Sequence, residues 1–250
     1  MAEGVGSLTL PRRKWYYPGV IRYSAVIPAY NEEKTIAAAI RQTAGFFRTL
    51  GEPFEVIVVN DGSRDRTGAE AERMRDEVPE LKVLNRAENF GKGGAVKKGV
   101  LEATGEWILF LDADLATDPS EFKKFLPLLD AHDILIGSRY VRGGLVKTSQ
   151  PVPRVIAGKI FNLIVRLYLG LDFADTQCGF KAFSRRAQSI FASLRTTGWA
   201  FDVELLFKAK RLAFSVAEVP IVWDDKRESR VKFGDFWHIM SELRRIKKRI

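Results

Sequence analysis

Two carboxylates, Asp112 and Asp114, stand two residues apart directly after the apolar run 107–111. At the end of a strand, side chains with this spacing can face one cation without the chain bending back. Mg²⁺ and Mn²⁺ prefer oxygen ligands, often one or two carboxylates completed by phosphate oxygens and water. Aspartates are also common turn residues. A divalent metal at Asp112 and Asp114 is therefore a hypothesis that other groups have to support.

Further polar segments follow three other apolar runs, at 28–33 (Pro-Ala-Tyr-Asn-Glu-Glu), 60–63 (Asn-Asp-Gly-Ser) and 137–139 (Gly-Ser-Arg). Asp61 can accept hydrogen bonds from a nucleobase or ribose, although turns and helix caps are alternative roles for such residues. The glycines of segment 89–95, together with Lys92, suit a phosphate or nucleotide at the beginning of a helix. Their spacing fits neither a Walker A loop nor a dinucleotide-binding fingerprint.

The elements that must position these groups alternate along the chain. Apolar runs at 24–28, 55–60, 81–84, 107–111 and 134–137 alternate with helical stretches at 33–50, 67–77, 93–103 and 119–130. The strands are too apolar to be half exposed, so the pattern predicts an α/β fold with a mostly parallel central sheet covered by helices on both faces. Ligands bind at the carboxyl ends of such strands, so we expect the polar segments to form one rim. A further helix at 201–211 and a strand at 216–223 are predicted beyond residue 137.

Composition narrows the class of protein. The 250 residues include 40 Lys and Arg against 31 Asp and Glu, a net charge of +9, and 46% hydrophobic residues, which excludes a disordered chain. The single cysteine, Cys178, excludes a disulfide framework and fits a reducing compartment. No run approaches the ~18–20 apolar residues that a membrane span needs. The charge predicts an anionic partner: nucleic acid, a phosphate-rich ligand or a membrane surface.

Two amphipathic segments combine basic residues with apolar ones. Segment 151–171 has a broad apolar surface interrupted by Arg154, Lys159 and Arg166, and segment 226–250 has nine basic residues interleaved with aromatic and aliphatic ones. This pattern is typical of helices that lie on an anionic bilayer. The alternative is packing against the domain, with a solvated basic face in the second case. We expect peripheral association with the cytoplasmic side of a membrane, with no transmembrane segment in this chain.

Taken in order, segments 26–32, 58–63, 89–93 and 112–114 resemble the family 2 nucleotide-sugar glycosyltransferases, which have the GT-A fold. Segments 137–140, 175–181 and 199–206 are similar to the polyprenyl-phosphate branch, which includes dolichyl-phosphate β-glucosyltransferases and dolichyl-phosphate mannose synthases. The resemblance covers about residues 22–245. It implies transfer of a hexose from a nucleotide sugar to a polyprenyl or dolichyl phosphate, with UDP-glucose favoured, GDP-mannose next, and Mg²⁺ or Mn²⁺ as cofactor.

The resemblance also implies roles for individual residues. The nucleotide-binding residues would be Pro28, Tyr30, Glu32, Asp61, Lys92 and Asp112. Asp112 and Asp114 would hold the metal, and Asp114, Arg139, Asp175 and Arg230 would form the catalytic group. The sugar and acceptor region would contain Gln177, Lys181, Trp199, Asp202, Glu204, Arg154 and Lys232. Two departures stand out: Ala116 replaces a glutamine of the mannose synthases, and the membrane helices that many relatives carry are not found here.

The sequence pattern and the resemblance together divide the chain into three parts. Residues 1–20 would form an N-terminal arm, and 21–225 the GT-A catalytic domain. Within it, 21–137 would be the nucleotide-binding half and 138–225 the acceptor-binding half, with the amphipathic helix at 151–171. Residues 226–250 would form a basic loop that covers the diphosphate and an amphipathic C-terminal helix.

The acceptor decides what the mechanism requires. A sugar hydroxyl needs a general base, whereas a lipid monophosphate is mostly dianionic near neutrality and needs cations around it. The chain supplies these after the metal motif: Arg139, Arg142, Lys147, Arg154 and Lys159. We therefore expect in-line, inverting transfer without an obligatory base, and Asp175 is the fallback base. A hydroxyl-acceptor glycosyltransferase and a nucleotidyltransferase remain alternatives, and a nucleic-acid binder is disfavoured because the rim is acidic.

Overall fold

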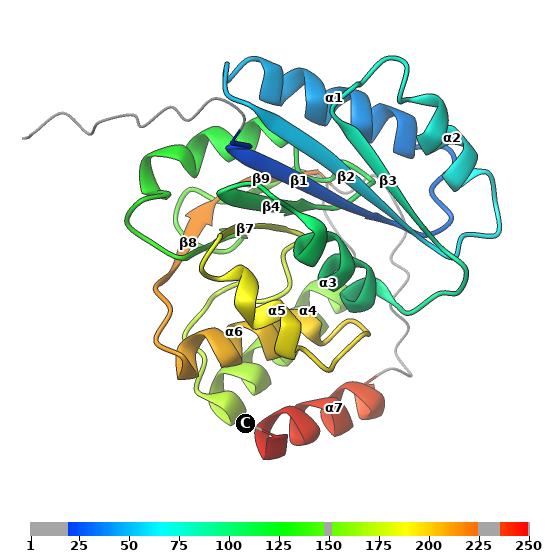
Figure 1. The fold of residues 1–250 in the computed structure, drawn as a ribbon. Helices are drawn as coiled ribbons and strands as arrows, with labels where there is room; N and C mark the ends of the chain where they lie inside the picture. The colour runs from blue at the N-terminus through cyan, green and yellow to red at the C-terminus, as the bar shows by residue number, and fades with distance from the viewer. Residues whose placement is uncertain (1–19, 148–151, 225–235, 250) are drawn as a thin grey trace, which may run out of the picture.

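The computed structural model describes residues 20–147, 152–224 and 236–249, which build a central sheet with helices on both faces (Figure 1). The seven strands lie in the order β3-β2-β1-β4-β7-β5-β8, and all run parallel except β7, which is antiparallel to β4 and β5. Their bounds are β1 Tyr23–Ala29, β2 Phe54–Asp61, β3 Leu81–Arg86, β4 Trp107–Leu111, β5 Ile134–Ser138, β7 Phe180–Ser184 and β8 Val216–Pro220. The predicted mostly parallel sheet is confirmed.

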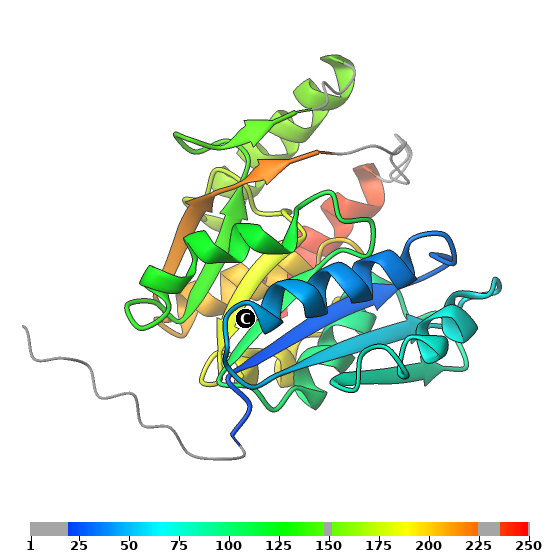
Figure 2. The ribbon, with the colours of Figure 1, turned by 90° about the horizontal axis from the view of Figure 1, so that it is seen from above.

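One face of the sheet is covered by α1 (Ile36–Arg48), α2 (Thr67–Arg73) and two short 3-10 helices, η1 (Pro119–Lys124) and η2 (Leu126–Leu128). Figure 2 shows α1 lying over the β1–β2 part of the sheet. Aromatic side chains fill this layer: the ring of Phe122 lies 5.6 Å from that of Phe47 and 5.5 Å from that of Tyr23. Offset and edge-to-face ring packing of this kind stabilises the layer beyond the apolar area it buries.

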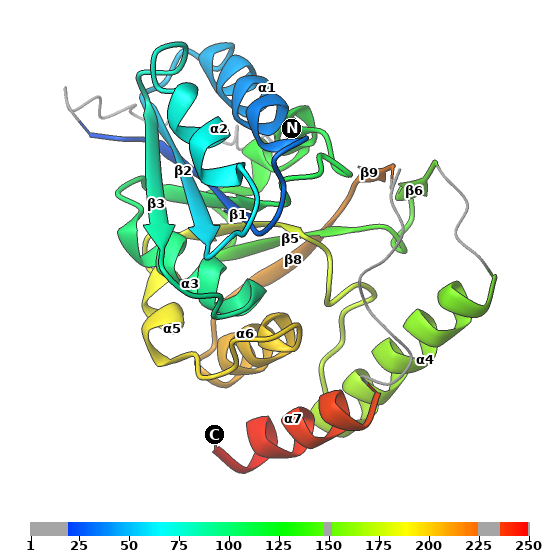
Figure 3. The same ribbon diagram turned by 90° about the vertical axis from the view of Figure 1, so that its right-hand side faces the viewer.

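The other face is covered by α3 (Lys92–Glu102), α5 (Gln188–Ser193) and α6 (Phe201–Arg211). Two outer helices add to the same apolar cluster: α4 (Val152–Leu169) contributes Val165 and Leu169, and α7 (Phe236–Arg249) contributes Leu243 and Ile246. Figure 3 shows α4 at the outside of the molecule beside α7. Lys247 of α7 donates to the backbone oxygen of Tyr168 of α4 at 2.9 Å, which joins the two helices.

A second, small sheet lies beyond the carboxyl ends of β5 and β8 (Figure 3). It pairs β6 (Leu145–Val146) in parallel with β9 (Val222–Trp223). The backbone amide of Asp224 then donates to the carbonyl of Ala116 at 2.7 Å. This bond brings the end of β9 to the segment that follows the Asp112–Asp114 pair.

The sequence-based boundaries differ from the structure in specific places. The predicted helix 119–130 is two short 3-10 helices, because Pro127 removes a backbone donor in the middle of the stretch. The predicted strand 216–223 is divided between β8 and β9. Strand β7 was not predicted, since a lysine, Lys181, stands at the centre of its sequence Phe-Lys-Ala-Phe-Ser. The short elements β6 and α5 were also not predicted.

Candidate active site

Four residues with left-handed backbone angles turn the chain at the carboxyl edge of the sheet. Asn31 has φ 54° after β1, Gly62 has φ 67° after β2, Gly91 has φ 84° before α3, and Leu115 has φ 56° after β4. Non-glycine residues adopt this region rarely, and such positions cluster at functional sites. Because β1, β2, β4 and β5 point the same way, the predicted polar segments share one edge, as expected.

The first cluster at this edge joins the end of β4 to the beginning of α3. Lys92 Nζ lies 2.7 Å from Asp112 Oδ1, and its ammonium lies 5.2 Å from the centroid of the Trp199 ring. Burial alone lowers the pKa of Lys92, but the nearby carboxylates of Asp112, Asp202 and Asp114 outweigh it, so the pKa is raised. Lys92 is therefore charged at neutral pH and occupies the side of Asp112 that faces α3.

Gly179 makes room for the Asp112 carboxylate. A Cβ atom built on Gly179 would lie 1.9 Å from Asp112 Oδ2, far inside van der Waals contact. The contact arises because the antiparallel strand β7 pairs Phe180 with Leu111, which sets the residue before β7 against the residue after β4. A glycine at this position is therefore a condition for the observed place of Asp112.

A buried ion pair lies beneath this cluster. Lys181 of β7 is fully buried, and its ammonium donates to the carbonyl of Cys178 at 2.7 Å and to Asp202 in the first turn of α6. Burial raises the pKa of Asp202 more than Lys181 and Lys92 lower it. The carboxylate also lies where the helix dipole favours negative charge. Lys181, Asp202, Lys92 and Asp112 thus form a run of alternating charges from the sheet to the edge.

The second cluster joins the end of β5 to the loop before β7. Arg139 Nε and Nη2 donate to the two carboxylate oxygens of Asp175 at 2.7 and 2.9 Å, and the backbone amide of Arg139 adds a third bond at 3.1 Å. Burial lowers the pKa of Arg139, but the bonds to Asp175 outweigh it and raise the pKa. The guanidinium also lies 5.0 Å from the ring of Trp223 in β9. Bidentate pairs of this kind fix geometry as well as charge.

The third cluster is at the end of β2. Asp61 is 2% exposed, and its carboxylate accepts the backbone amide of Phe90 at 3.1 Å and lies 3.2 Å from Arg86 Nη1. Burial raises the pKa of Asp61 more than the Phe90 amide and Arg86 lower it. Arg86 stacks 4.0 Å from the centroid of the Phe90 ring. In this structure Asp61 holds the loop that leads into Lys92.

The metal hypothesis can be tested on the ligands that the chain offers. Asp114 Oδ1 accepts the backbone amide of Ala116 at 3.0 Å, and Asp112 lies two residues before it. Among the described residues no group of three or more His, Cys, Asp or Glu side chains gathers as a metal site. Two carboxylates fit Mg²⁺ or Mn²⁺ when phosphate oxygens and water complete the shell. The donor set therefore fits a metal that arrives with a diphosphate.

The other predicted residues have different surroundings. Glu32 Oε2 accepts from the hydroxyl of Thr35 at 2.8 Å, and Glu204 accepts the backbone amides of Arg195 and Thr196 at 3.1 and 2.7 Å. Glu204 therefore holds the loop before α6. Pro28 lies in β1, Tyr30 directly after it, and Gln177 in the loop before β7, all three partly buried, whereas Trp199 is 44% exposed. The side chain of Arg154 and the whole of Arg230 and Lys232 lie outside the described residues.

Sequence reasoning missed several residues that shape the site: Arg86, Asn162, Gly179, Glu218 and Trp223. Asn162 and Glu218 had a signal, because each is a polar residue in an otherwise apolar stretch, of α4 and β8 respectively. Gly179 lies in segment 175–181, but nothing in that segment indicates its contact with Asp112, since a close approach between distant segments is visible only in three dimensions.

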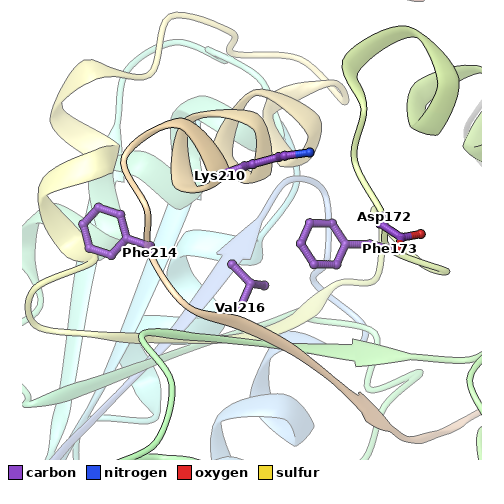
Figure 4. Close-up of a pocket in the computed structure, with 5 residues that line it drawn as sticks. All are labelled: Asp172, Phe173, Lys210, Phe214 and Val216. Atoms are coloured by element: carbon purple, nitrogen blue, oxygen red, sulfur yellow. The ribbon is translucent and has the colours of Figure 1, made fainter.

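A hollow elsewhere on the surface is separate from these clusters (Figure 4). It has a volume of about 280 Å³ and is lined by Asp172, Phe173, Lys210, Phe214 and Val216. Val216 pairs with Ile134 at the beginning of β5, so this hollow is at the amino ends of the parallel strands. The carboxyl edge remains the candidate active site.

The sheet order, the antiparallel β7 and the acidic pair after β4 define a GT-A glycosyltransferase fold. Glucosyl-3-phosphoglycerate synthase from Mycobacterium tuberculosis, solved with Mn²⁺, uridine diphosphate and glucosyl-3-phosphoglycerate, has this fold with a TM-score of 0.65. The two are 19% identical, and the match covers 93% of this chain and 84% of that one.

The family model for glycosyl transferase family 2 matches residues 24–191, and the chain belongs to this family of glycosyltransferases. A dolichyl-phosphate beta-glucosyltransferase from Trichomonas vaginalis is 35% identical over 231 residues, which cover 88% of this chain and 68% of that protein. The corresponding Drosophila melanogaster protein is 36% identical, with 87% and 71% covered. The corresponding Homo sapiens protein is 34% identical, with 86% and 70% covered.

Proposed function

We propose that the protein transfers a hexose, with inversion, from a nucleotide sugar to a polyprenyl or dolichyl phosphate. The observation that carries this proposal is the Arg139–Asp175 pair, in which both carboxylate oxygens of Asp175 accept hydrogen bonds from Arg139. A carboxylate held in this way is a poor general base, while a guanidinium has five N–H donors and keeps several for a second anion. The cluster thus suits a phosphate acceptor better than a sugar hydroxyl.

The proposed reaction needs no proton transfer. A phosphate oxygen of the acceptor attacks C1 of the sugar, the bond from C1 to the donor diphosphate breaks, and its electron pair leaves with the nucleoside diphosphate. The acceptor brings its charge already formed, because the second pKa of a phosphate monoester is about 6. Lys92 and Arg139 hold negative charge on the two reacting phosphate groups, which stabilises the transition state electrostatically.

Asp112 and Asp114 are the residues that would hold Mg²⁺ or Mn²⁺ with the donor diphosphate. When bound there, the metal neutralises charge that develops on the leaving group. In this structure Lys92 pairs with the Asp112 carboxylate at 2.7 Å. The relatives named dolichyl-phosphate beta-glucosyltransferases support glucose as the sugar and dolichyl phosphate as the acceptor. We favour UDP-glucose as the donor, with GDP-mannose next. Ala116, in place of the glutamine of mannose synthases, supports this order.

Helix α4 supplies a surface for the lipid side of the acceptor. Ile160, Leu163 and Leu167 are 51%, 53% and 77% exposed, an apolar stripe along one side of the helix. We infer that this stripe rests on an anionic membrane, at the cytoplasmic side that the single cysteine favours. None of the helices in the described parts of the chain has the length and hydrophobicity to cross a membrane.

Helix α7 takes a different place from the one predicted with its apolar side on the bilayer. Leu243 is fully buried and Ile246 is 2% exposed, both against the body of the protein, while Arg244, Arg245 and Lys248 are exposed. The described part of α7 therefore follows the packed alternative. Its exposed cations still favour an anionic surface beside α4, with on the order of 1 kcal/mol for each one near the membrane.

Product analysis tests the proposed function. The protein is incubated with Mn²⁺, a panel of nucleotide sugars and a short polyprenyl phosphate, and the lipid products are analysed by mass spectrometry. We expect a glucosyl-phosphate lipid and free UDP with UDP-glucose, and no product when polyprenol replaces the phosphate. Asp114→Asn should abolish product, while Asp118→Asn should not, because Asp118 is an exposed cap of η1 outside the site. Absence of lipid product with every donor, from protein that binds UDP, contradicts the proposal.

Vesicle sedimentation tests the membrane surface. Binding to vesicles that contain phosphatidylglycerol should be strong at low salt and should weaken as salt is raised. Leu167→Glu should reduce binding at least about tenfold, since burial of a leucine contributes ~1.5–3 kcal/mol. Leu101→Glu is the matched control, because Leu101 is 43% exposed on α3, away from α4. Equal binding by both variants would count against α4 as the membrane surface.

A further inference from the structure

Asn162 connects helix α4 to the loop that carries Asp175. Its Nδ2 donates to the backbone oxygens of Phe173 and Ala174, and its Oδ1 accepts from the hydroxyl of Thr176 at 3.1 Å. Thr176 is 1% exposed, so its hydroxyl is shielded from solvent. One side chain of α4 therefore binds the loop on both sides of Asp175.

The opposite side of the same loop is held from the sheet. Glu218 of β8 accepts the backbone amide of Ala174 at 2.8 Å and that of Asp175 at 3.0 Å. The amides of the loop are thus bound to β8, and the carbonyls and the Thr176 hydroxyl are bound to α4. This leaves the Asp175 carboxylate with one orientation, toward Arg139 at the end of β5.

We propose that Asn162 is a positioning residue. By fixing the 173–176 backbone to α4, it holds the Arg139–Asp175 pair in the orientation that binds the acceptor phosphate. The proposal rests on the proposed function, because it assigns the pair to the acceptor phosphate. Asn162 is next to Leu163 of the exposed apolar stripe, so the helix that meets the lipid is also the helix that orients the anion-binding pair. The position of α4 on the domain and the orientation of the Arg139 guanidinium are therefore coupled through the side-chain amide of Asn162.

Kinetics with a short polyprenyl phosphate in the absence of vesicles isolates this role from membrane binding. Asn162→Ala should raise the KM for the acceptor about tenfold, while the KM for the nucleotide sugar changes less than twofold. Leu101→Ala is the control, since Leu101 is an exposed leucine of α3 with no role in the proposed site, and it should leave both KM values unchanged in this assay. Thr176→Val should raise the acceptor KM in the same direction, and the double variant should be no worse than Asn162→Ala alone, because residues that share a hydrogen bond are not additive.

Hydrogen exchange measured by mass spectrometry gives a readout that does not depend on the reaction. Amides of the 173–176 loop should exchange faster in Asn162→Ala than in the wild type, and Leu101→Ala should match the wild type. An unchanged exchange rate in Asn162→Ala overturns the inference, as does a parallel rise of donor and acceptor KM. If the wild type transfers sugar to no polyprenyl phosphate, the proposed function fails, and faster exchange would then still support the link between α4 and the loop.

Discussion

Asp112 and Asp175 are both aspartates at the carboxyl edge of the sheet, but the structure holds them differently. The Asp112 side chain is 33% exposed and, within the described parts of the chain, pairs with one cation, Lys92, while the backbone of Gly179 lies against it. The Asp175 side chain is 3% exposed, and it accepts two guanidinium bonds and a backbone amide, all from Arg139. One carboxylate can exchange its partner for a ligand, while the other serves as a fixed part of the framework.

The difference in exposure and partners gives the two carboxylates different electrostatic roles. A carboxylate that binds a metal has to remain accessible and must give up its cation when the donor arrives. A carboxylate that orients an arginine has to keep its partner throughout, because a guanidinium with a fixed plane binds an anion at low entropic cost. Under the proposed function, the exchangeable pair therefore lies on the nucleotide side of the edge and the permanent pair on the acceptor side.

The largest effect is expected for the exchangeable carboxylate. Asp112→Asn should lower turnover about 10³-fold, the range found when one group that stabilises transition-state charge is removed. The loss should be partly recovered at high Mn²⁺ concentration, since the variant keeps one oxygen ligand and Asp114. Steady-state rates over a Mn²⁺ titration measure this, with Asp118→Asn as the control. A loss that Mn²⁺ leaves unchanged would contradict the exchangeable role of Asp112.

A second substitution acts on the same carboxylate without changing its charge. Gly179→Ala should lower turnover about 10²-fold, because its Cβ would displace Asp112, and a misplacement of 1 Å can have an effect of that size. Gly45→Ala is the matched control: no atom lies within 4 Å of a Cβ at Gly45, an exposed position in α1. The control should be as active as the wild type and slightly more stable. An active Gly179→Ala variant would show that turnover does not depend on the observed position of the Asp112 carboxylate.

The two carboxylates also show what can be predicted from the sequence. The Asp112–Asp114 spacing alone gave a metal site only as a hypothesis, but the apolar run before it predicted strand β4 and therefore the edge of the sheet at which the pair lies. The parallel strands β1, β2, β4 and β5 were predicted for the same reason. Such patterns are local, and a local pattern is enough to specify where a buried strand ends.

The permanent pair depends on features that no local pattern contains. Strand β7 has a fully buried lysine, Lys181, at its centre. Its burial requires Asp202 of α6, 21 residues further along the chain, whose carboxylate accepts a hydrogen bond from the ammonium and compensates its charge. Without β7 the contact between Gly179 and Asp112 cannot be anticipated. The motif resemblance named both Asp175 and Arg139, but their pairing with each other and the supports Asn162 and Glu218 follow from tertiary contacts.

A smaller effect is expected for the permanent carboxylate. Asp175→Asn should lower turnover about tenfold to a hundredfold through misplacement of Arg139, and added Mn²⁺ should not recover it. Donor binding, measured by calorimetry with UDP and Mn²⁺, should stay close to that of the wild type. A loss above about 10⁴-fold, the upper range for a general base, with metal and donor binding intact would instead show that Asp175 acts as the base.

The smallest effect concerns Cys178, which lies three residues after Asp175 and is 2% exposed. Burial, with a contribution from the charge of Asp175, raises the pKa of this thiol to about 12. Since the thiolate is the reactive form, the native protein should resist alkylation at pH 8, where an unfolded thiol with a pKa of about 8.5 reacts readily.

The raised pKa of Cys178 also determines how the free energy of unfolding depends on pH. Because folding raises the thiol pKa, the contribution of Cys178 to the free energy of unfolding is complete below about pH 8.5 and is lost as the pH rises toward 12. Comparison of the free energy of unfolding of the wild type and of Cys178→Ala over this pH range separates the contribution of Cys178 from those of other titrating groups. Alkylation followed by mass spectrometry should also be faster in Asp175→Asn than in Asp112→Asn, because only the former loosens the loop around Cys178. Equal rates in the two variants would remove the distinction between a permanent and an exchangeable carboxylate.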